Sequence, residues 1–187
     1  MKPTATTLTR TLRVGLVCAA LFVAGVRAGY AQTTVTLPDT SQTTTLTATV
    51  SDQARVTVPV GVTFTVNDVL SATTSSPASV TVTGIVLATA AKQLRVSLQA
   101  DAATFTPPVV GAATWSAGAV SWSAASWTNA TGVAGTLSNS SYNAVATCAA
   151  DTQTCSTTGL TFTLAADAGV KRAGSHTLTV RWKFESI

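Results

Sequence analysis

Few residues in this 187-residue chain are able to do chemistry: it has one histidine, three cysteines and seven Asp and Glu residues. A serine hydrolase would need His176 beside a serine and a carboxylate, but no Gly-x-Ser-x-Gly turn occurs. A structural zinc needs about four Cys, His or carboxylate ligands. A glycosidase needs two carboxylates roughly 5–10 Å apart, and the single glutamate, Glu185, lies near the C-terminus. We therefore predict no enzyme, no metal site and no cofactor.

Residues 1–31 have the pattern of a secretory signal peptide. Three basic residues precede an apolar run over residues 14–26, and small residues follow it. The run is shorter than the roughly 20 residues that span a bilayer as a helix. We predict cleavage after Ala31, with cleavage after Ala28 as the alternative. The mature protein would be periplasmic, at the cell surface or extracellular, and would meet the membrane only through its signal peptide.

The net charge of +4 resides in this N-terminal segment. Four of the 11 basic residues lie in residues 1–31, and all seven acidic residues lie beyond it, so residues 32–187 carry seven charges of each sign. Nucleic-acid binding depends on clustered Lys and Arg. The only adjacent basic pair is Lys171-Arg172, and we predict no nucleic-acid partner.

Two cysteines, Cys148 and Cys155, remain after removal of the signal peptide, which contains Cys18. An even number of cysteines in an exported chain favours a disulfide. The spacing is not Cys-x-x-Cys, and no neighbouring residue type lowers a thiol pKa. We predict a structural disulfide that closes a small turn and stabilises the fold by roughly 2–3 kcal/mol.

Alternating apolar and polar residues predict an all-β fold, because alternate side chains of a strand lie on opposite faces. Roughly eight to ten short strands with one polar face each favour an antiparallel β-sandwich, immunoglobulin-like or pilin-like, over residues 32–187. A closed barrel is the alternative. A change of parity predicts a bulge at Gly84, and Pro59 predicts an edge, kinked or divided strand. The alternation is clearest at residues 35–37, 46–50, 56–66, 80–87, 94–98, 120–122, 160–164 and 178–184.

The aromatic residues between 115 and 142 allow two interpretations. Trp115, Trp127 and Tyr142 could form an exposed platform that stacks on sugar rings, as in a carbohydrate-binding module. They could instead cover the ends of a core that Trp122 and Trp182 fill. His176 has the parity of Trp182, which predicts a hydrogen-bonded histidine at the rim of the buried face.

Residues 173–182, together with the signal peptide and the Thr-rich strands, resemble secreted bacterial surface proteins of the pilin and spore-coat kind. Gly174 stands fourteenth from the C-terminus, where chaperone–usher pilins carry a glycine. Ser186 stands where those pilins have a penultimate tyrosine, and their disulfide lies near the N-terminus rather than at Cys148 and Cys155. The resemblance implies a surface β-sandwich and raises the question of assembly by donation of a strand.

The nearly uncharged, Thr-rich residues 32–50 bear on the same question. Such a segment can pair with its own sheet or add to the edge of a neighbour's sheet. We predict an exported structural or adhesive surface protein without catalytic activity, with self-assembly by strand addition as one mode of action. Its partners would be copies of itself or an extracellular polysaccharide. The alternative function is a carbohydrate-binding module that uses the tryptophans of residues 115–127.

Overall fold

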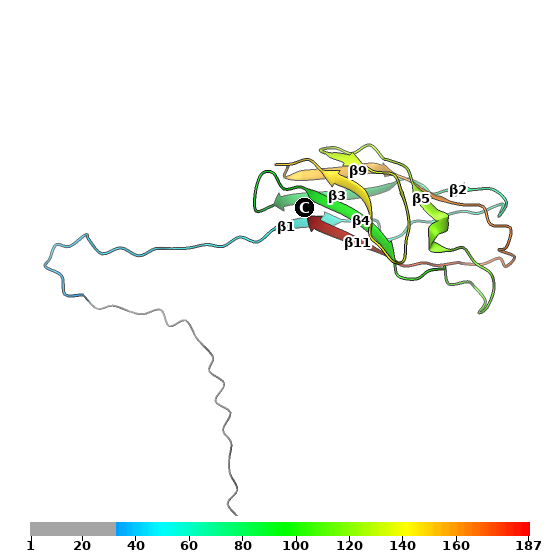
Figure 1. Cartoon of the computed structure of the whole chain (residues 1–187), viewed down its shortest axis with the longest axis horizontal. Helices are drawn as coiled ribbons and strands as arrows, with labels where there is room; N and C mark the ends of the chain where they lie inside the picture. The colour runs from blue at the N-terminus through cyan, green and yellow to red at the C-terminus, as the bar shows by residue number, and fades with distance from the viewer. Residues whose placement is uncertain (1–32) are drawn as a thin grey trace, which may run out of the picture. The chain divides into compact units, whose positions relative to one another are not determined.

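A computed structural model describes residues 33–187, so the predicted signal peptide lies outside the described residues. Thr47–Ile187 form one compact unit, and residues 33–46 do not belong to it. The compact unit consists of strands and loops with one 3-10 turn, Ala117–Ala119, which confirms the all-β class (Figure 1). The strands are β1 (Gln53–Thr57), β2 (Thr73–Thr74), β3 (Ala78–Val86), β4 (Leu94–Ala100), β5 (Val120–Trp122), β6 (Ala130–Gly132), β7 (Gly135–Thr136), β8 (Asn143–Cys148), β9 (Thr154–Leu160), β10 (Phe162–Leu164) and β11 (Val180–Ser186).

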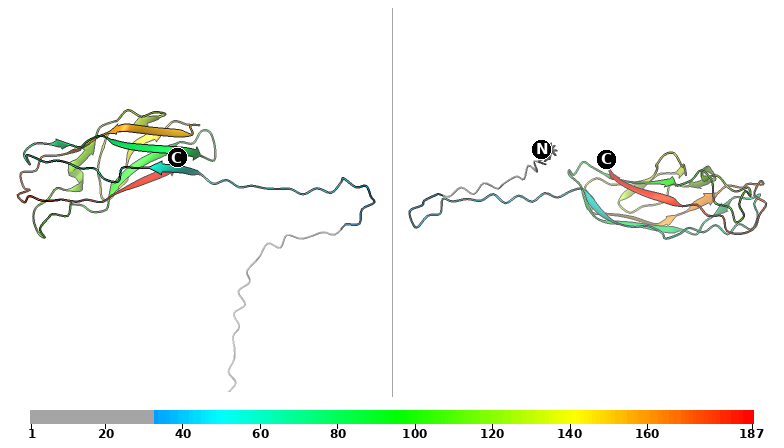
Figure 2. Two further views of the ribbon diagram at one scale, coloured as in Figure 1. Left: turned by 180° about the vertical axis from the view of Figure 1, so that it is seen from behind. Right: turned by 90° about the horizontal axis from the view of Figure 1, so that it is seen from below.

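These strands form three antiparallel sheets with the orders β1-β3-β9, β2-β10-β5-β7 and β11-β4-β8-β6. Only Thr161 separates β9 from β10, so the first two sheets follow one another along a nearly continuous strand. Inward side chains of these two sheets, such as Val80 and Phe162, share one buried cluster with Leu98 and Val145 of the third sheet. Apolar faces of separate sheets thus pack on each other, as predicted for a sandwich (Figure 2).

Strand β3 shows how the alternation determines the local structure. Val80 and Val82 are fully buried, and the Ser and Thr residues on either side of each valine face outward. Gly84 has a φ of +58°, a backbone conformation that glycine adopts without steric cost. The pairing of β3 with β1 shifts register at this point. The predicted bulge at Gly84 is therefore confirmed.

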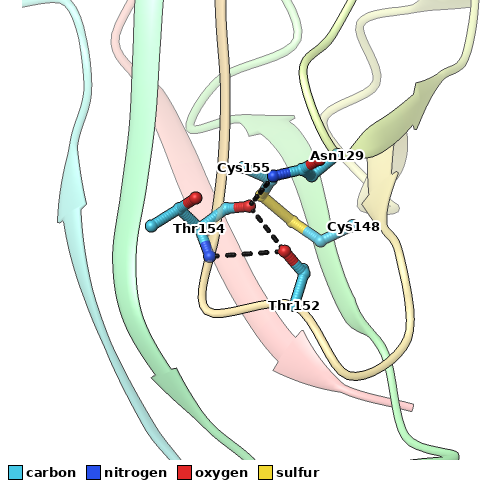
Figure 3. The surroundings of a disulfide bond; sticks show 5 residues. All are labelled: Asn129, Cys148, Thr152, Thr154 and Cys155. Carbon is cyan, nitrogen blue, oxygen red and sulfur yellow. Dashed lines mark hydrogen bonds between the residues drawn. A yellow bond between two sulfur atoms is a disulfide. The ribbon is translucent and has the colours of Figure 1, made fainter.

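The predicted disulfide joins Cys148, the last residue of β8, to Cys155 in β9, with Cα atoms 5.8 Å apart. It links the β11-β4-β8-β6 sheet to the β1-β3-β9 sheet. Both cysteines are buried in a small second cluster with Val82, Ile85 and Leu94. The turn between them is closed by hydrogen bonds around the Thr154 carbonyl, which accepts from the Thr152 hydroxyl (2.9 Å) and the Asn129 amide (3.2 Å) (Figure 3).

Two strand predictions near the N-terminus are wrong. Residues 33–52 form no strand in this structure, although 35–37 and 46–50 alternate. The long run over residues 56–66 is divided, as Pro59 predicted: β1 ends at Thr57, and the chain continues without a ladder partner. The alternating pattern therefore continues through two stretches that the sheets of this chain do not take up.

Candidate functional site: an open apolar groove

Residues 58–66, which follow β1, form the first wall of an open groove. The chain there alternates, and the side chains of Val58, Val62, Phe64 and Val66 pack against the core while remaining half-buried. No backbone hydrogen bond of these residues is seen within residues 33–187. This wall is thus a strand in its side-chain pattern, but its peptide groups lack the ladder partners that a sheet normally supplies.

The second wall is formed by β11 and the residues that lead into it. β11 pairs with β4 along its whole length and is the edge strand of its sheet. Before β11, Thr177 exchanges two backbone hydrogen bonds with Thr106, at 2.7 and 3.0 Å. The inward side chains of this wall, Leu178, Val180 and Trp182, are half-buried. β1 and β11 run along the same border of the sandwich (Figures 1 and 2).

Between the two walls lies a groove with a volume of about 990 Å³. Its floor is part of the hydrophobic core, so an occupant of the groove would rest directly on buried side chains. The floor residues are Leu98, Phe105, Trp115, Val120, Leu137, Phe162, Leu164 and Val170. Phe105 and Trp115 make an edge-to-face contact with ring centroids 6.4 Å apart. Phe162 makes a second such contact, at 6.2 Å, with the buried Trp122, which does not itself line the groove.

His176 lies at the rim of the groove and is held by two hydrogen bonds. Its Nε2 is 3.1 Å from the carbonyl oxygen of Arg172, and its Nδ1 is 2.7 Å from the Thr114 hydroxyl. A carbonyl only accepts, so Nε2 carries the proton, and in the neutral ring Nδ1 accepts from Thr114. The predicted hydrogen-bonded rim histidine is confirmed. Neither partner is a carboxylate, and together the two hydrogen bonds fix the orientation of the ring.

The groove contains little charge. Lys171 and Arg172 are exposed where the second wall begins, and the other residues that line the groove are uncharged. Asp68 lies just beyond the first wall, where it accepts from the Leu70 N–H and the Ser71 hydroxyl, both at 2.9 Å. These hydrogen bonds, that from Leu70 first, lower the pKa of the Asp68 carboxyl. Asp68 therefore stabilises a turn and leaves the groove itself apolar.

The structure separates the three aromatic residues that sequence proposed as a sugar platform. Trp115 is buried, with 5% exposure, and its Nε1 donates to the carbonyl of Ala165 at 3.0 Å. Trp127 packs against the core and is half-buried. Tyr142 is exposed (39%), with the Lys183 ammonium 5.5 Å from its ring centre. Trp115 therefore belongs to the groove floor, and no ring contact joins the three in the described part of the chain.

Residues 33–52 are much more exposed to solvent than the rest of the described chain. Almost all of them are exposed, including Leu37 (82%), Leu46 (92%) and Val50 (67%). Asp39, the charged residue among 33–50, accepts hydrogen bonds from Ser41 and Gln42. These bonds, with the Ser41 hydroxyl as the largest contribution, lower the pKa of its carboxyl. Residues 33–52 thus contain alternating apolar residues that belong to no sheet, and the groove of the same chain is open.

Sequence reasoning located some parts of this site and missed the site as a whole. The division of the run at Pro59 and the alternation of residues 178–184 were both visible. Neither pattern indicated that the two stretches border the same space or that this space is uncovered. The sequence offered one signal: it has more alternating segments than the sheets contain strands for. Residues 46–50 and residues 58–66 both alternate, and neither belongs to a sheet.

No protein-family model, no curated protein and no solved structure matches this chain. Residues 33–187 contain no helix with the length and apolarity needed to cross a membrane. The same residues contain no group of three or more His, Cys, Asp or Glu side chains placed to hold a metal ion.

Proposed function

We propose that this protein is an exported structural subunit that assembles with copies of itself at or beyond the cell surface. In this proposal an N-terminal segment of one copy lies as a strand in the groove of the next copy. The observation that carries the proposal is the open apolar groove between two unpaired chain edges, in a chain that also has an unpaired alternating segment, residues 33–52.

The groove has the properties of a strand-binding site. Each wall offers backbone donors and acceptors, and edge strands with free peptide groups pair readily with an added chain. The half-buried side chains between the walls would lose their remaining contact with water when a strand is added. Burial of one Leu or Val side chain contributes about 1.5–3 kcal/mol, so inward apolar residues of an added strand would favour association.

The segment of the same chain is poorly placed to fill this groove. A hairpin with its turn at residues 51–52 would place Ser41 opposite Val62. It would also place Asp39 opposite Phe64. Directly opposite residues of an antiparallel pair share a face, so this register would drive a polar and a charged side chain into the apolar groove.

A different turn does not help. A loop one residue longer would place Gln42 and Thr40 in those same positions, which are also polar. The residues available for a tight turn, Ser51 and Asp52, lack the Asn-Gly or Gly-containing pairs that two-residue hairpins need. Because both tight-turn registers place polar side chains opposite Val62 and Phe64, a second copy is the better source of the strand.

Two features support export. Residues 1–31 have the composition and order of a secretory signal peptide. The Cys148–Cys155 disulfide requires an oxidising compartment, and such bonds are rare in proteins of the reducing cytosol. An extracellular assembly would also benefit from the near-zero net charge of residues 32–187, because like charges on stacked copies would repel each other.

The proposal is tested by mixing two variants that fail in complementary ways. A deletion of residues 33–50 retains the groove and removes the strand. The full chain with Leu178→Lys retains the strand and places a charge in the groove. We expect each variant alone to be monomeric by light scattering, and the mixture to form 1:1 dimers that grow no further.

Circular dichroism and urea unfolding show whether each variant is folded before mixing, and Val62→Lys is a second groove variant on the other wall. If the unmodified protein is a monomer at high concentration, or if both folded variants assemble like the unmodified chain, the proposal is wrong. A mixture of folded variants that stays monomeric would also contradict it.

A further inference from the structure

The exposed N-terminal segment contains two apolar runs of opposite parity. Val35 and Leu37 form the first run, and Leu46, Ala48 and Val50 form the second. A local turn separates them, in which the Asp39 carboxylate accepts from the Ser41 backbone N–H at 3.0 Å and from the Ser41 hydroxyl at 2.6 Å. A single straight strand cannot direct both runs to one face, so only one of them can fill a groove.

The two walls define what this strand must supply. On each wall the inward side chains repeat every second residue, over residues 62–66 and 178–182. A strand between the walls would be paired on both sides and would need a free N–H at each paired position. Proline cannot donate in such a position, and a charge buried there without a partner is costly.

The second run meets these requirements and the first does not. Residues 43–51 contain no proline and no charge, and they present three apolar side chains on one face with Thr44 in line. The first run has two apolar residues and is followed at once by Pro38 and Asp39. A seven-residue strand over residues 44–50 extends for about 23 Å, which is long enough to run along both walls.

We propose that residues 44–50 of one copy are the strand that occupies the groove of the next copy, with Leu46, Ala48 and Val50 facing the groove floor. This inference rests on the proposed function. Its consequence is mechanical: only Ser51 and Asp52 separate this strand from β1 of its own copy. Successive domains are then joined by two residues and form a stiff rod. A strand at residues 33–37 would leave a 15-residue spacer with a mean span of about 20 Å.

A matched pair of lysine substitutions in the full chain tests which run inserts. Leu46→Lys and Leu37→Lys change side chains that are 92% and 82% exposed in the single copy, so neither substitution removes a contact of the folded domain. We expect Leu46→Lys to abolish assembly in light scattering and Leu37→Lys to leave particle size unchanged. The reverse result, or loss of assembly in both variants, would overturn the assignment to residues 44–50.

The groove variant Leu178→Lys separates this inference from the proposed function. If it abolishes assembly while both N-terminal variants assemble, the groove is used but residues 44–50 do not fill it. If all three variants assemble like the unmodified chain, assembly through the groove fails altogether, and the inference fails with it.

An insertion tests the mechanical consequence. Six Gly and Ser residues placed between Ser51 and Asp52 lengthen the proposed spacer, and the same insertion between Thr40 and Ser41 does not. We expect electron micrographs to show straight rods for the unmodified chain and the second insertion, and bent chains of domains for the first. Flexible chains in the unmodified protein, or equal stiffness with both insertions, would contradict a two-residue connection.

Discussion

Strands β4 and β11 are hydrogen-bonded neighbours with the same alternating pattern, but their inner faces have different surroundings. On β4 the inward residues Leu94, Val96, Leu98 and Ala100 are all buried, with exposures of 5% or less. On β11 the inward residues are half-buried. The ladder between the two strands is continuous over seven pairs, so a pairing defect does not explain the difference. β4 has a strand on each side, whereas β11 faces the groove.

The comparison shows what a period-two pattern does and does not determine. It specifies which face of a strand is apolar, because side chains alternate. It does not specify whether the chain itself covers that face. On β11 the cover is incomplete, and the aromatic residues Trp182 and Phe184 stack on each other with ring centroids 6.4 Å apart at the border. An apolar face left open in this way is typical of an interaction site.

The largest difference between the two strands should appear on truncation of their side chains. Leu98→Ala on β4 removes a fully enclosed side chain, and we expect it to lower the free energy of unfolding by about 2–5 kcal/mol. Leu178→Ala, next to β11, removes a half-exposed side chain and should cost about 1 kcal/mol in the monomer. Urea unfolding of both variants measures the two values.

The deletion of residues 33–50 is the appropriate background for this measurement, because it removes the proposed donor strand and leaves the groove empty. If the two substitutions lowered the free energy of unfolding equally in that background, the groove would be closed in solution. The inner faces of β4 and β11 would then be equally buried.

The next largest effect concerns the disulfide, which joins the two sheets at a site where the packing is complete. Replacement of Cys148 and Cys155 by alanine removes a constraint on the unfolded chain, and we expect a loss of about 2–3 kcal/mol. Both sulfurs belong to a buried cluster that does not border the groove. Assembly should therefore survive at temperatures where the variant is folded, as light scattering can show. Loss of assembly in a folded variant would mean that the disulfide also shapes the groove.

Much of the fold could be predicted from the sequence, because three of its four strands of seven or more residues alternate clearly, whereas β9 does not. β3, β4 and β11 were recognised by their inward Val, Leu and Trp residues, and the bulge by the change of parity at Gly84. β2 and β7 have only two residues each, which is too few for a period to show. They form because neighbouring strands supply their hydrogen bonds, and this depends on the tertiary structure.

The site was less predictable, and two residues show why. Trp115 was a candidate for an exposed platform, but its side chain is buried in the core cluster, where its ring meets Phe105 and His176 edge to face and Ala165 accepts its N–H. Leu46 was expected in a strand, since alternation favours one. Its side chain is almost fully exposed because no edge of its own chain receives it. Sequence periodicity contains no information on which edges are free.

A smaller effect should appear in the fluorescence of Trp182, which distinguishes the empty from the filled groove. The ring is half-buried beside the groove, and an added strand would shield it from solvent. We expect assembly to reduce acrylamide quenching of the unmodified chain. In Trp182→Phe the change should be much smaller, because Trp115 and Trp122 are already buried and the half-buried Trp127 does not line the groove. Assembly with unchanged quenching of Trp182 would place the contact elsewhere.

The smallest effect concerns the outer face of β11, where Glu185 pairs with Arg95 of β4 and with Lys183 of its own strand. The Glu185 carboxylate accepts from Lys183 Nζ at 2.5 Å and from Arg95 Nη2 at 2.6 Å. These bonds, that from Lys183 first, lower the pKa of Glu185. A lowered pKa in the folded state means that the unfolded state binds the proton more readily. The stabilisation is therefore complete above the ordinary pKa of a glutamic acid, about 4.3, and is lost as the pH falls through the lower folded value.

Glu185→Gln should accordingly flatten the dependence of stability on pH in the acidic range, with little change in the fold. The difference between the two proteins should be largest at neutral pH and low salt, and it should shrink in 1 M salt because the groups are solvent-accessible. Thermal unfolding across a pH series measures this. A difference that persists at high salt and low pH would show that Glu185 contributes through packing. In that case packing of the Glu185 side chain, in addition to the hydrogen-bonded ladder, would hold β11 against β4.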